Sequence, residues 1–382
     1  MNCEKLFRRI DELQPEYVKF WEDVINLESP TEDKARVDAC SAYYAEKARA
    51  RGWKVVVHPI EGSGDIVAIT MNPDAPGKPV VFSGHVDTVH PVGLFGSPAA
   101  HRDETYMYGP GCQDCKGGTV ASFLAMAALD DIGFRSRPVK LVLQSDEENS
   151  SRTSGKATVR AMYEESKDCA VFLNTEGYKR NSTTVTRKGI SKYQLTVTGK
   201  AVHASLCDTG ISAITEAAYK VIELEKMKDP MGLTCNCGLF SGGTAVNAVP
   251  EKCTFTLDIR FRNKEQMEAA DELVKKVAET SYIPGSTCEV ELLSRRVAME
   301  FTDINRAIYE KVNAIYAEVG LPVMGTHMNR GGSDAADMTV YGVPTLDSLG
   351  TTGEFSHSIR ERTELVSLAE SARRLAAVAY CL

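Results

Sequence analysis

The segment PVVFSGHVDTV, residues 79–89, largely decides how this chain folds. Its first residues, Pro79–Phe82, form a short apolar run that is typical of a buried strand. Two polar side chains, His85 and Asp87, follow this run. In open α/β sheets, ligands bind beyond the carboxyl ends of the strands. The segment therefore predicts a sheet strand that presents a histidine at a functional edge.

Four further side chains could share a site with His85. Asp114 lies in the glycine-rich GPGCQDCKGG, Glu148 in QSDEEN, Glu176 in LNTEG, and His357 near the end of the chain. Each motif alone is weak, because HxD pairs are common and an acidic DEE turn is usually solvated. Two histidines and three carboxylates nevertheless suit a pair of zinc-type ions, provided that one carboxylate bridges them. The set indicates a two-metal hydrolase.

Composition limits the classes of partner and compartment. With 382 residues the chain is long enough for two domains, and a formal charge of −8 argues against nucleic acid or an anionic membrane surface as partner. No apolar stretch is long enough for a membrane span, and no signal peptide is visible. Eleven cysteines without framework spacing fit a reducing, cytoplasmic location.

Helix-like and strand-like segments alternate in the first half, which predicts an α/β fold. A helix is expected over 31–51, capped by Ser29 or Thr31, and another over 116–129. The expected strands are 53–59, 65–71, 80–83, 139–143 and 169–173.

The order changes near Arg187. The next expected elements are strand 191–197, helix 211–228, strands 233–240 and 253–261, helix 264–280 and strand 288–293. This βαββαβ order predicts a ferredoxin-like α+β unit. The α/β alternation of the first half resumes with segments 304–319, 344–349 and 361–379. We therefore expect a discontinuous domain, residues 1–187 and 299–382, interrupted by an inserted domain, residues 188–298.

The ordered motifs resemble one known family. HVDTV, GPGCQDCKGG, DEE, the isolated Glu176, GKAVHA, GGSDAA and the late histidine are similar to the co-catalytic zinc aminoacylase and carboxypeptidase family. That family includes glutamate carboxypeptidase, acetylornithine deacetylase, succinyl-diaminopimelate desuccinylase and peptidase T. The resemblance covers nearly the whole chain. It implies a zinc-peptidase catalytic domain, with a mixed central sheet flanked by helices, and an inserted dimerisation or lid domain.

The resemblance also implies roles for single residues. It implies two Zn²⁺ ions per chain, which Co²⁺ or Mn²⁺ could replace. The implied ligands are His85 and Glu176 on one ion, Glu148 and His357 on the other, and Asp114 bridging both. Glu147 corresponds to the general base, and Asp87 to the carboxylate that positions a ligand histidine. The family's bridging aspartate is commonly followed by a cis peptide, so Asp114–Cys115 is expected to be cis.

In the inserted domain, His203 of GKAVHA corresponds to a histidine that reaches the partner's metal site in a homodimer and stabilises the oxyanion. Asn247 corresponds to a residue supporting the same region, and Arg260 and Gly332 to substrate-binding positions. Judged without the family, His203 is equally an ordinary loop histidine, and Arg260 equally a surface arginine in an ion pair. Cys112 and Cys115 are expected to pack, and the remaining histidines to lie at the surface or in loops: His58, His90, His101 and His327.

The expected function is hydrolysis of the amide bond of a small peptide or N-acyl amino acid, most like that of a glutamate carboxypeptidase. An aminotripeptidase and an N-acyl-amino-acid deacylase remain alternatives, because they use the same machinery. A catalytically silent metal-binding scaffold protein is an alternative of another class. The presence of Glu147, His203 and all five ligands argues against it. We expect a homodimer without nucleic-acid or membrane partners.

Overall fold

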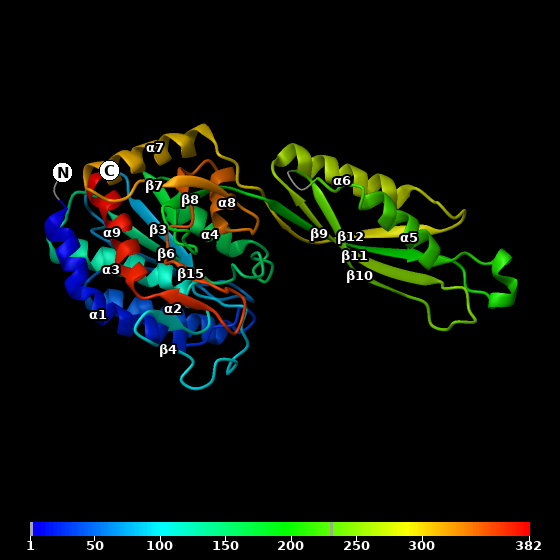
Figure 1. The fold of residues 1–382 in the computed structure, drawn as a ribbon, viewed down its shortest axis with the longest axis horizontal. Helices are drawn as coiled ribbons and strands as arrows, with labels where there is room; N and C mark the ends of the chain where they lie inside the picture. The colour runs from blue at the N-terminus through cyan, green and yellow to red at the C-terminus, as the bar shows by residue number, and fades with distance from the viewer. Residues whose placement is uncertain (1–2, 230–231) are drawn as a thin grey trace. The chain divides into compact units, whose positions relative to one another are not determined.

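The computed structural model describes residues 3–229 and 232–382, and the chain forms two compact units (Figure 1). The first unit comprises Met1–Val185, Phe301–Met328 and Ser333–Leu382, and the second comprises Thr186–Glu300 and Asn329–Gly332. The sequence had assigned residues 329–332 to the first domain. They lie in the second unit, in which the Arg187 guanidinium donates to the carbonyls of Gly331 and Gly332.

The elements of the first unit alternate as the α/β pattern predicted. They are α1 (Glu4–Asn26), α2 (Lys34–Ala50), β1 (Lys54–His58), β2 (Ile66–Met71), β3 (Val80–His85), β4 (His101–Arg102), β5 (Tyr106–Tyr108), α3 (Lys116–Asp131), β6 (Val139–Gln144), α4 (Ala157–Ser166), β7 (Val171–Asn174), α7 (Asp303–Glu318), α8 (Asp334–Val340), β14 (Thr345–Leu346), β15 (Gly353–Glu354), β16 (Arg362–Glu364) and α9 (Val366–Cys381). Two strands, β8 (Ser182–Arg187) and β13 (Gly325–Asn329), pair where the chain passes between the units.

A mixed six-stranded sheet forms the centre of this unit, in the order β1-β2-β6-β3-β7-β14. Strand β3 lies between β6 and β7 and runs parallel to both. Strand β14 is parallel to β7, whereas β2 is antiparallel to its neighbours β1 and β6. The carboxyl ends of β3, β6 and β7 therefore meet at one edge, as expected for a ligand-binding α/β sheet.

Alternation along the strands divides the core between the two faces of this sheet. Phe82 and Leu141 point to the face that α1, α2, α3, α7 and α9 cover. Val81 and Val142 point to the opposite face, where they pack with Met162 of α4. The burial of whole strands such as β3 explains why they read as continuous apolar runs. A separate four-stranded sheet, β15-β16-β5-β4, lies in the same unit.

The second unit has the predicted ferredoxin-like order. Its elements are β9 (Gly189–Thr198), the short 3-10 helix η1 (Ala204–Thr209), α5 (Ala213–Leu224), β10 (Thr234–Gly242), β11 (Lys252–Phe261), α6 (Lys264–Glu279) and β12 (Thr287–Arg296). The antiparallel sheet has the order β10-β11-β9-β12. Alternate residues of β9 and β11 pack against α5 and α6, with Leu195 and Phe255 fully buried.

The capping expected for α2 was wrong. Its N-cap is Asp33, whose side chain accepts from the backbone N–H of Arg36. Ser29 and Thr31 have other partners, because the Ser29 hydroxyl donates to the Val86 carbonyl and the Thr31 hydroxyl donates to Asp87. These two residues thus fasten the chain before α2 to the segment beyond β3.

Among the described residues, no helix combines the length and apolar character that crossing a membrane requires.

Candidate metal centre

Three neighbouring parallel strands deliver candidate ligands to one edge of the central sheet. His85 is the last residue of β3 and pairs in register with Gln144 at the end of β6. Glu148 follows β6 by four residues, and Glu176 follows the end of β7 by two. Because parallel strands end at the same edge, residues far apart in the sequence converge here.

Asp114 lies between the two candidate histidines. Its Oδ1 is 3.2 Å from Nε2 of His85, and its Oδ2 is 3.2 Å from Nε2 of His357. A carboxylate that presents one oxygen to each of two ligand sets is arranged as a bridging ligand would be. The Asp114–Cys115 peptide bond is cis, as the family resemblance implied.

The remaining carboxylates complete two groups around Asp114. Oε1 of Glu176 lies 3.7 Å from Nε2 of His85, and Oε2 of Glu148 lies 3.1 Å from Nε2 of His357. The five side chains thus gather around Asp114, and the ligand atoms of His85, Asp114 and Glu148 lie within 4.8 Å of one another. The division into two ligand sets stays a prediction. Imidazole and carboxylate donors at these separations suit divalent zinc-type ions.

The clustered carboxylates of the candidate site favour binding of cations. Burial and the charge of Asp114 raise the pKa of Glu148, because two carboxylates compete in a desolvated site. Hydrogen bonds to Asp114 and Glu148 raise the pKa of His357. Without a metal, the site therefore favours protons on these groups. Divalent ions would take over that role, so the donors fit the ions that the family resemblance implied.

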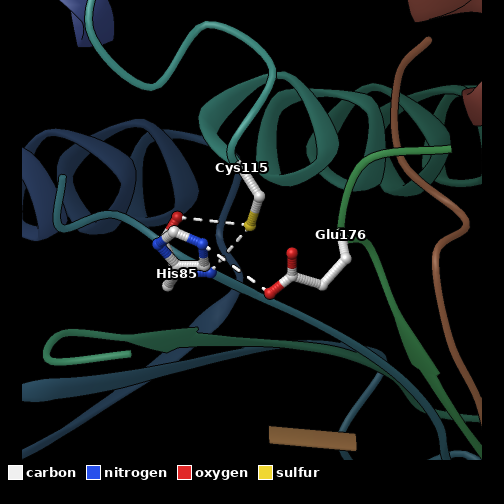
Figure 2. A group of neighbouring side chains, drawn as sticks. All are labelled: His85, Cys115 and Glu176. Carbon is white, nitrogen blue, oxygen red and sulfur yellow. Dashed lines mark hydrogen bonds and ion pairs between the residues drawn. The ribbon is translucent and has the colours of Figure 1, made fainter. Parts of the chain in front are cut away.

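Cys115 is a neighbour that sequence reasoning did not place at the site. Figure 2 shows its sulfur between the backbone of His85 and the carboxylate of Glu176. Sγ accepts from the His85 N–H at 3.0 Å, and the ligand atoms of His85, Cys115 and Glu176 lie within 4.8 Å of one another. Burial raises the pKa of Cys115 to about 12, so the thiol is protonated at neutral pH. Its visible role is to hold the end of β3.

Asp87 is fully buried behind the candidate ligands. Nδ1 of His85 lies 3.0 Å from the backbone carbonyl of Asp87 and 3.4 Å from its Oδ1. The carboxylate also accepts the backbone N–H groups of Glu147 and Glu148, both at 3.2 Å. Asp87 therefore holds the backbone of the DEE turn in addition to lying beside the His85 ring.

Two glycines allow α3 and β3 to approach the segment that carries Glu176. A Cβ at Gly118 would lie 1.9 Å from the carbonyl oxygen of Thr175, and a Cβ at Gly84 would lie 2.7 Å from its hydroxyl. No side chain fits at either distance. Close packing therefore explains why glycine stands at Gly84 and at Gly118 of the KGG motif. His357 adopts φ +62°, an uncommon conformation for a non-glycine residue that often marks functional sites.

Glu147 is buried within the DEE turn, with 9% of its surface exposed. Its backbone is held by Asp87, and Glu148 follows it directly. Its expected role as general base stays a prediction.

The other predicted residues belong to the second unit. His203 is exposed, and its Nδ1 accepts from the N–H of Ser205. Asn247 lies beside it, because its carbonyl accepts from the N–H of Ala204. Arg260 forms an ion pair with Asp258 at 2.5 Å, the alternative that the sequence left open for it.

Gly332, the fourth of these residues, packs against Arg296, where a Cβ would lie 2.1 Å from its Cδ. The structure thus brings His203 and Asn247 together and gives Gly332 a packing role within this unit.

His90, expected at the surface or in a loop, lies in a loop but is buried, with 5% of its surface exposed. Its Nε2 lies 3.0 Å from Oε2 of Glu361. These residues are 271 positions apart, so no local pattern reveals the contact.

Comparisons with known proteins identify the family of this chain. A model of peptidase family M20/M25/M40 matches residues 81–380. The chain is 26% identical over 376 residues to carboxypeptidase G2 of Pseudomonas sp. (strain RS-16), covering 97% of this chain and 89% of that protein. It is 26% identical over 324 residues to succinyl-diaminopimelate desuccinylase of Paracoccus denitrificans (strain Pd 1222), covering 76% and 80% respectively.

A solved structure has a similar fold. Aminopeptidase PepT from Bacillus cereus ATCC 10987 matches with a TM-score of 0.79 and 22% sequence identity, covering 96% of this chain and 98% of that chain. At this identity the likeness concerns the fold.

Proposed function

This chain belongs to peptidase family M20/M25/M40, and we propose that it is a dinuclear zinc amidohydrolase of the carboxypeptidase type. At the level of the family it is a metal-dependent hydrolase of peptide or acyl-amino-acid amides. The observation that carries the proposal is Asp114, whose two oxygens each face one histidine at 3.2 Å. We propose that the substrate is a small peptide or N-acyl amino acid, cut next to a free α-carboxylate.

Two observations favour a carboxypeptidase over the alternatives. The similarity to carboxypeptidase G2 extends over 97% of this chain. In addition, the second unit carries a cluster of cations, Lys188, Arg260, Arg262 and Arg330. Burial lowers the pKa of Lys188, and the three arginines lower it further, because like charges oppose protonation. Asp229 and the Asp258 partner of Arg260 offset part of this repulsion. We propose Arg260 as the anchor of a substrate carboxylate, which would compete with Asp258 for the guanidinium.

The proposed chemistry divides among the chain's own residues. Ions held by the five ligands would supply Lewis acidity and lower the pKa of the attacking water. Glu147 accepts the proton of that water and returns it to the departing amine. Asp87 keeps Glu147 and Glu148 in register through their backbone N–H groups. His203 donates a hydrogen bond to the oxygen on which negative charge develops.

We propose that His203 acts in a homodimer formed through the second unit. Exposed apolar side chains lie on α5 and on the edge strand β10, where Ile222 is 60% and Leu239 is 69% exposed. An exposed apolar edge strand readily pairs with a second copy of itself, and a two-fold axis brings identical surfaces together.

A blocked-substrate series tests the proposed substrate class. Zinc-loaded and cobalt-loaded enzyme would be assayed on dipeptides, tripeptides and N-acyl amino acids, each with a free or amidated C-terminus. A carboxypeptidase should lose activity when the α-carboxylate is amidated and should tolerate an acylated N-terminus. Each signal should disappear in Glu147→Gln, which controls for a contaminating peptidase.

The same series separates the alternatives. Activity that requires a free N-terminus and is confined to tripeptides would replace the proposal with an aminotripeptidase. Activity on N-acyl amino acids with none on peptides would indicate a deacylase. Metal binding without hydrolysis across the series would favour the scaffold protein.

A further inference from the structure

We infer that Glu361 is a positioning residue for the candidate metal centre, holding the backbone of the bridging Asp114 and joining it to the segment of His357. The inference rests on the proposed metal site and concerns a buried residue that is not one of the five candidate ligands. It follows from hydrogen bonds that a single buried carboxylate makes to residues about 250 positions earlier in the chain.

Both oxygens of Glu361 face the loop that carries Asp114. Oε1 accepts the N–H groups of Gln113 at 2.9 Å and Asp114 at 3.1 Å. Oε2 accepts the N–H of Gly111 at 3.2 Å and lies 3.0 Å from Nε2 of His90. Three amides of one short loop thus end on one side chain, and buried amides require such acceptors.

The buried surroundings of the Glu361 carboxylate make any displacement from its hydrogen-bond donors energetically unfavourable. Glu361 is 1% exposed, and His90 beside it is 5% exposed. A buried carboxylate is tolerated only when hydrogen bonds or opposite charge compensate it. The three amides and His90 supply the hydrogen bonds, and the ammonium of fully buried Lys116 is among the nearby charges. Glu361 therefore has one well-defined position, which the Asp114 loop shares.

The same residue ties the loop to the second histidine. Glu361 follows His357 by four residues, and its own N–H donates to the carbonyl of Ser358 at 2.9 Å. A second link runs from the Ser356 hydroxyl to Oε1 of Gln113. Asp114 and His357 must approach one ion together, so a side chain that fixes both segments sets their spacing.

Glu361→Ala and Glu361→Gln test this role, with Glu364→Ala as the matched control. Glu364 lies three residues away, and its carboxylate pairs with Arg180 at 2.7 Å, away from the Asp114 loop. Zinc bound per chain would be measured by elemental analysis across a series of chelator-buffered zinc concentrations. Melting temperatures would be measured in EDTA and in excess zinc, since a bound ligand stabilises the folded state.

In Glu361→Ala we expect zinc affinity to fall about 10- to 100-fold, the usual effect of losing a group that orients metal ligands. The rise in melting temperature on adding zinc should shrink with it, whereas the Glu364→Ala control should match the wild type. Glu361→Gln keeps one oxygen for the amides of Gln113 and Asp114, so its affinity should fall between those of Glu361→Ala and the wild type. If Glu361→Ala does not fold, Glu361→Gln alone still tests the inference.

Wild-type zinc affinity in both Glu361 variants would overturn the inference. So would a lower melting temperature in EDTA accompanied by an unchanged zinc-induced rise, because Glu361 would then be purely structural. A wild-type protein that binds no divalent ion would instead overturn the proposed metal centre itself. The two failures are therefore distinguishable.

Discussion

Asp87 shows how one buried side chain organises several functional ones. Its Oδ2 accepts the Thr31 hydroxyl at 2.8 Å as well as the N–H of Glu148, and its Oδ1 accepts the N–H of Glu147. The two backbone N–H groups lie on the turn that presents the proposed base and a ligand. A local HxD motif in the sequence thus becomes, in the fold, a connection between β3 and the residues after β6.

Glu147→Gln should abolish proton transfer while leaving the metal ligands in place. Gln has the same shape but cannot accept the water proton, so turnover should fall at least 10²-fold, the usual contribution of a general base. Steady-state kinetics and metal content would be measured together, with the exposed Glu164→Gln as a surface control. Near-wild-type turnover at normal metal content would assign the base to another residue.

At the same scale, the sequence predicted the side chains of the candidate centre but not their support. His85, Asp114, Glu148 and Glu176 stand in local motifs or follow strand-like runs, so reading along the chain finds them. The contacts of Glu361 connect positions 247 to 250 residues apart. Such contacts depend on how the loops close over the sheet, which no local pattern specifies.

Among the elements, α3 and the strands of the two main sheets were predictable, whereas α1 and α4 were missed. Residues Leu6, Ile10, Leu13, Tyr17 and Phe20 are buried at helical spacing along Glu4–Asn26. The charges between them, and Pro15 inside the helix, concealed a pattern that was present in the sequence. Short elements such as α8 and β8 depend on tertiary contacts and were not predicted, whereas β14 falls within the expected segment 344–349.

Asp131, at the end of α3, is bound by arginines from two other elements. It accepts from Arg9 of α1 at 2.7 Å and from Arg51, the C-cap of α2, at 3.0 Å. Partial burial alone would raise the pKa of Asp131, but the two arginines outweigh it and lower that pKa. A carboxyl whose pKa is lowered on folding contributes stability above its unfolded pKa of about 3.9, and this contribution is lost as pH falls through the folded value.

Asp131→Asn should therefore cost stability at neutral pH and little in acid. We expect a loss of about 1 kcal/mol, because the pair is partly exposed and screened by solvent. Urea unfolding of the metal-free protein between pH 7 and pH 3 would measure the difference in the free energy of unfolding. Glu12→Gln is the control, because Glu12 also pairs with Arg9 but not with Arg51. A difference from wild type that stays constant down to pH 3 would contradict the sign of the pKa shift.

At the scale of the whole molecule, the proposed active site combines residues of both units. In the proposed homodimer, the first unit of one chain would be completed by the second unit of its partner. The five candidate ligands and Glu147 all belong to the first unit, whereas His203 belongs to the second. The central sheet of the first unit is uninterrupted by the second, because the chain leaves the first unit within β8, returns before α7, and enters the second unit again only at Asn329–Gly332.

Mixing a Glu147→Gln chain with a His203→Ala chain tests whether His203 serves the partner. Each variant alone should be impaired, since losing an oxyanion donor costs about 10²- to 10³-fold in turnover. If His203 acts in trans, each heterodimer contains one site with both lesions and one with neither. Random exchange should then restore about one quarter of the sites. Native mass spectrometry would establish that subunits had exchanged. With exchange shown, the absence of recovered activity would place His203 in its own chain's site or outside catalysis, because every site in the heterodimer would then carry one lesion.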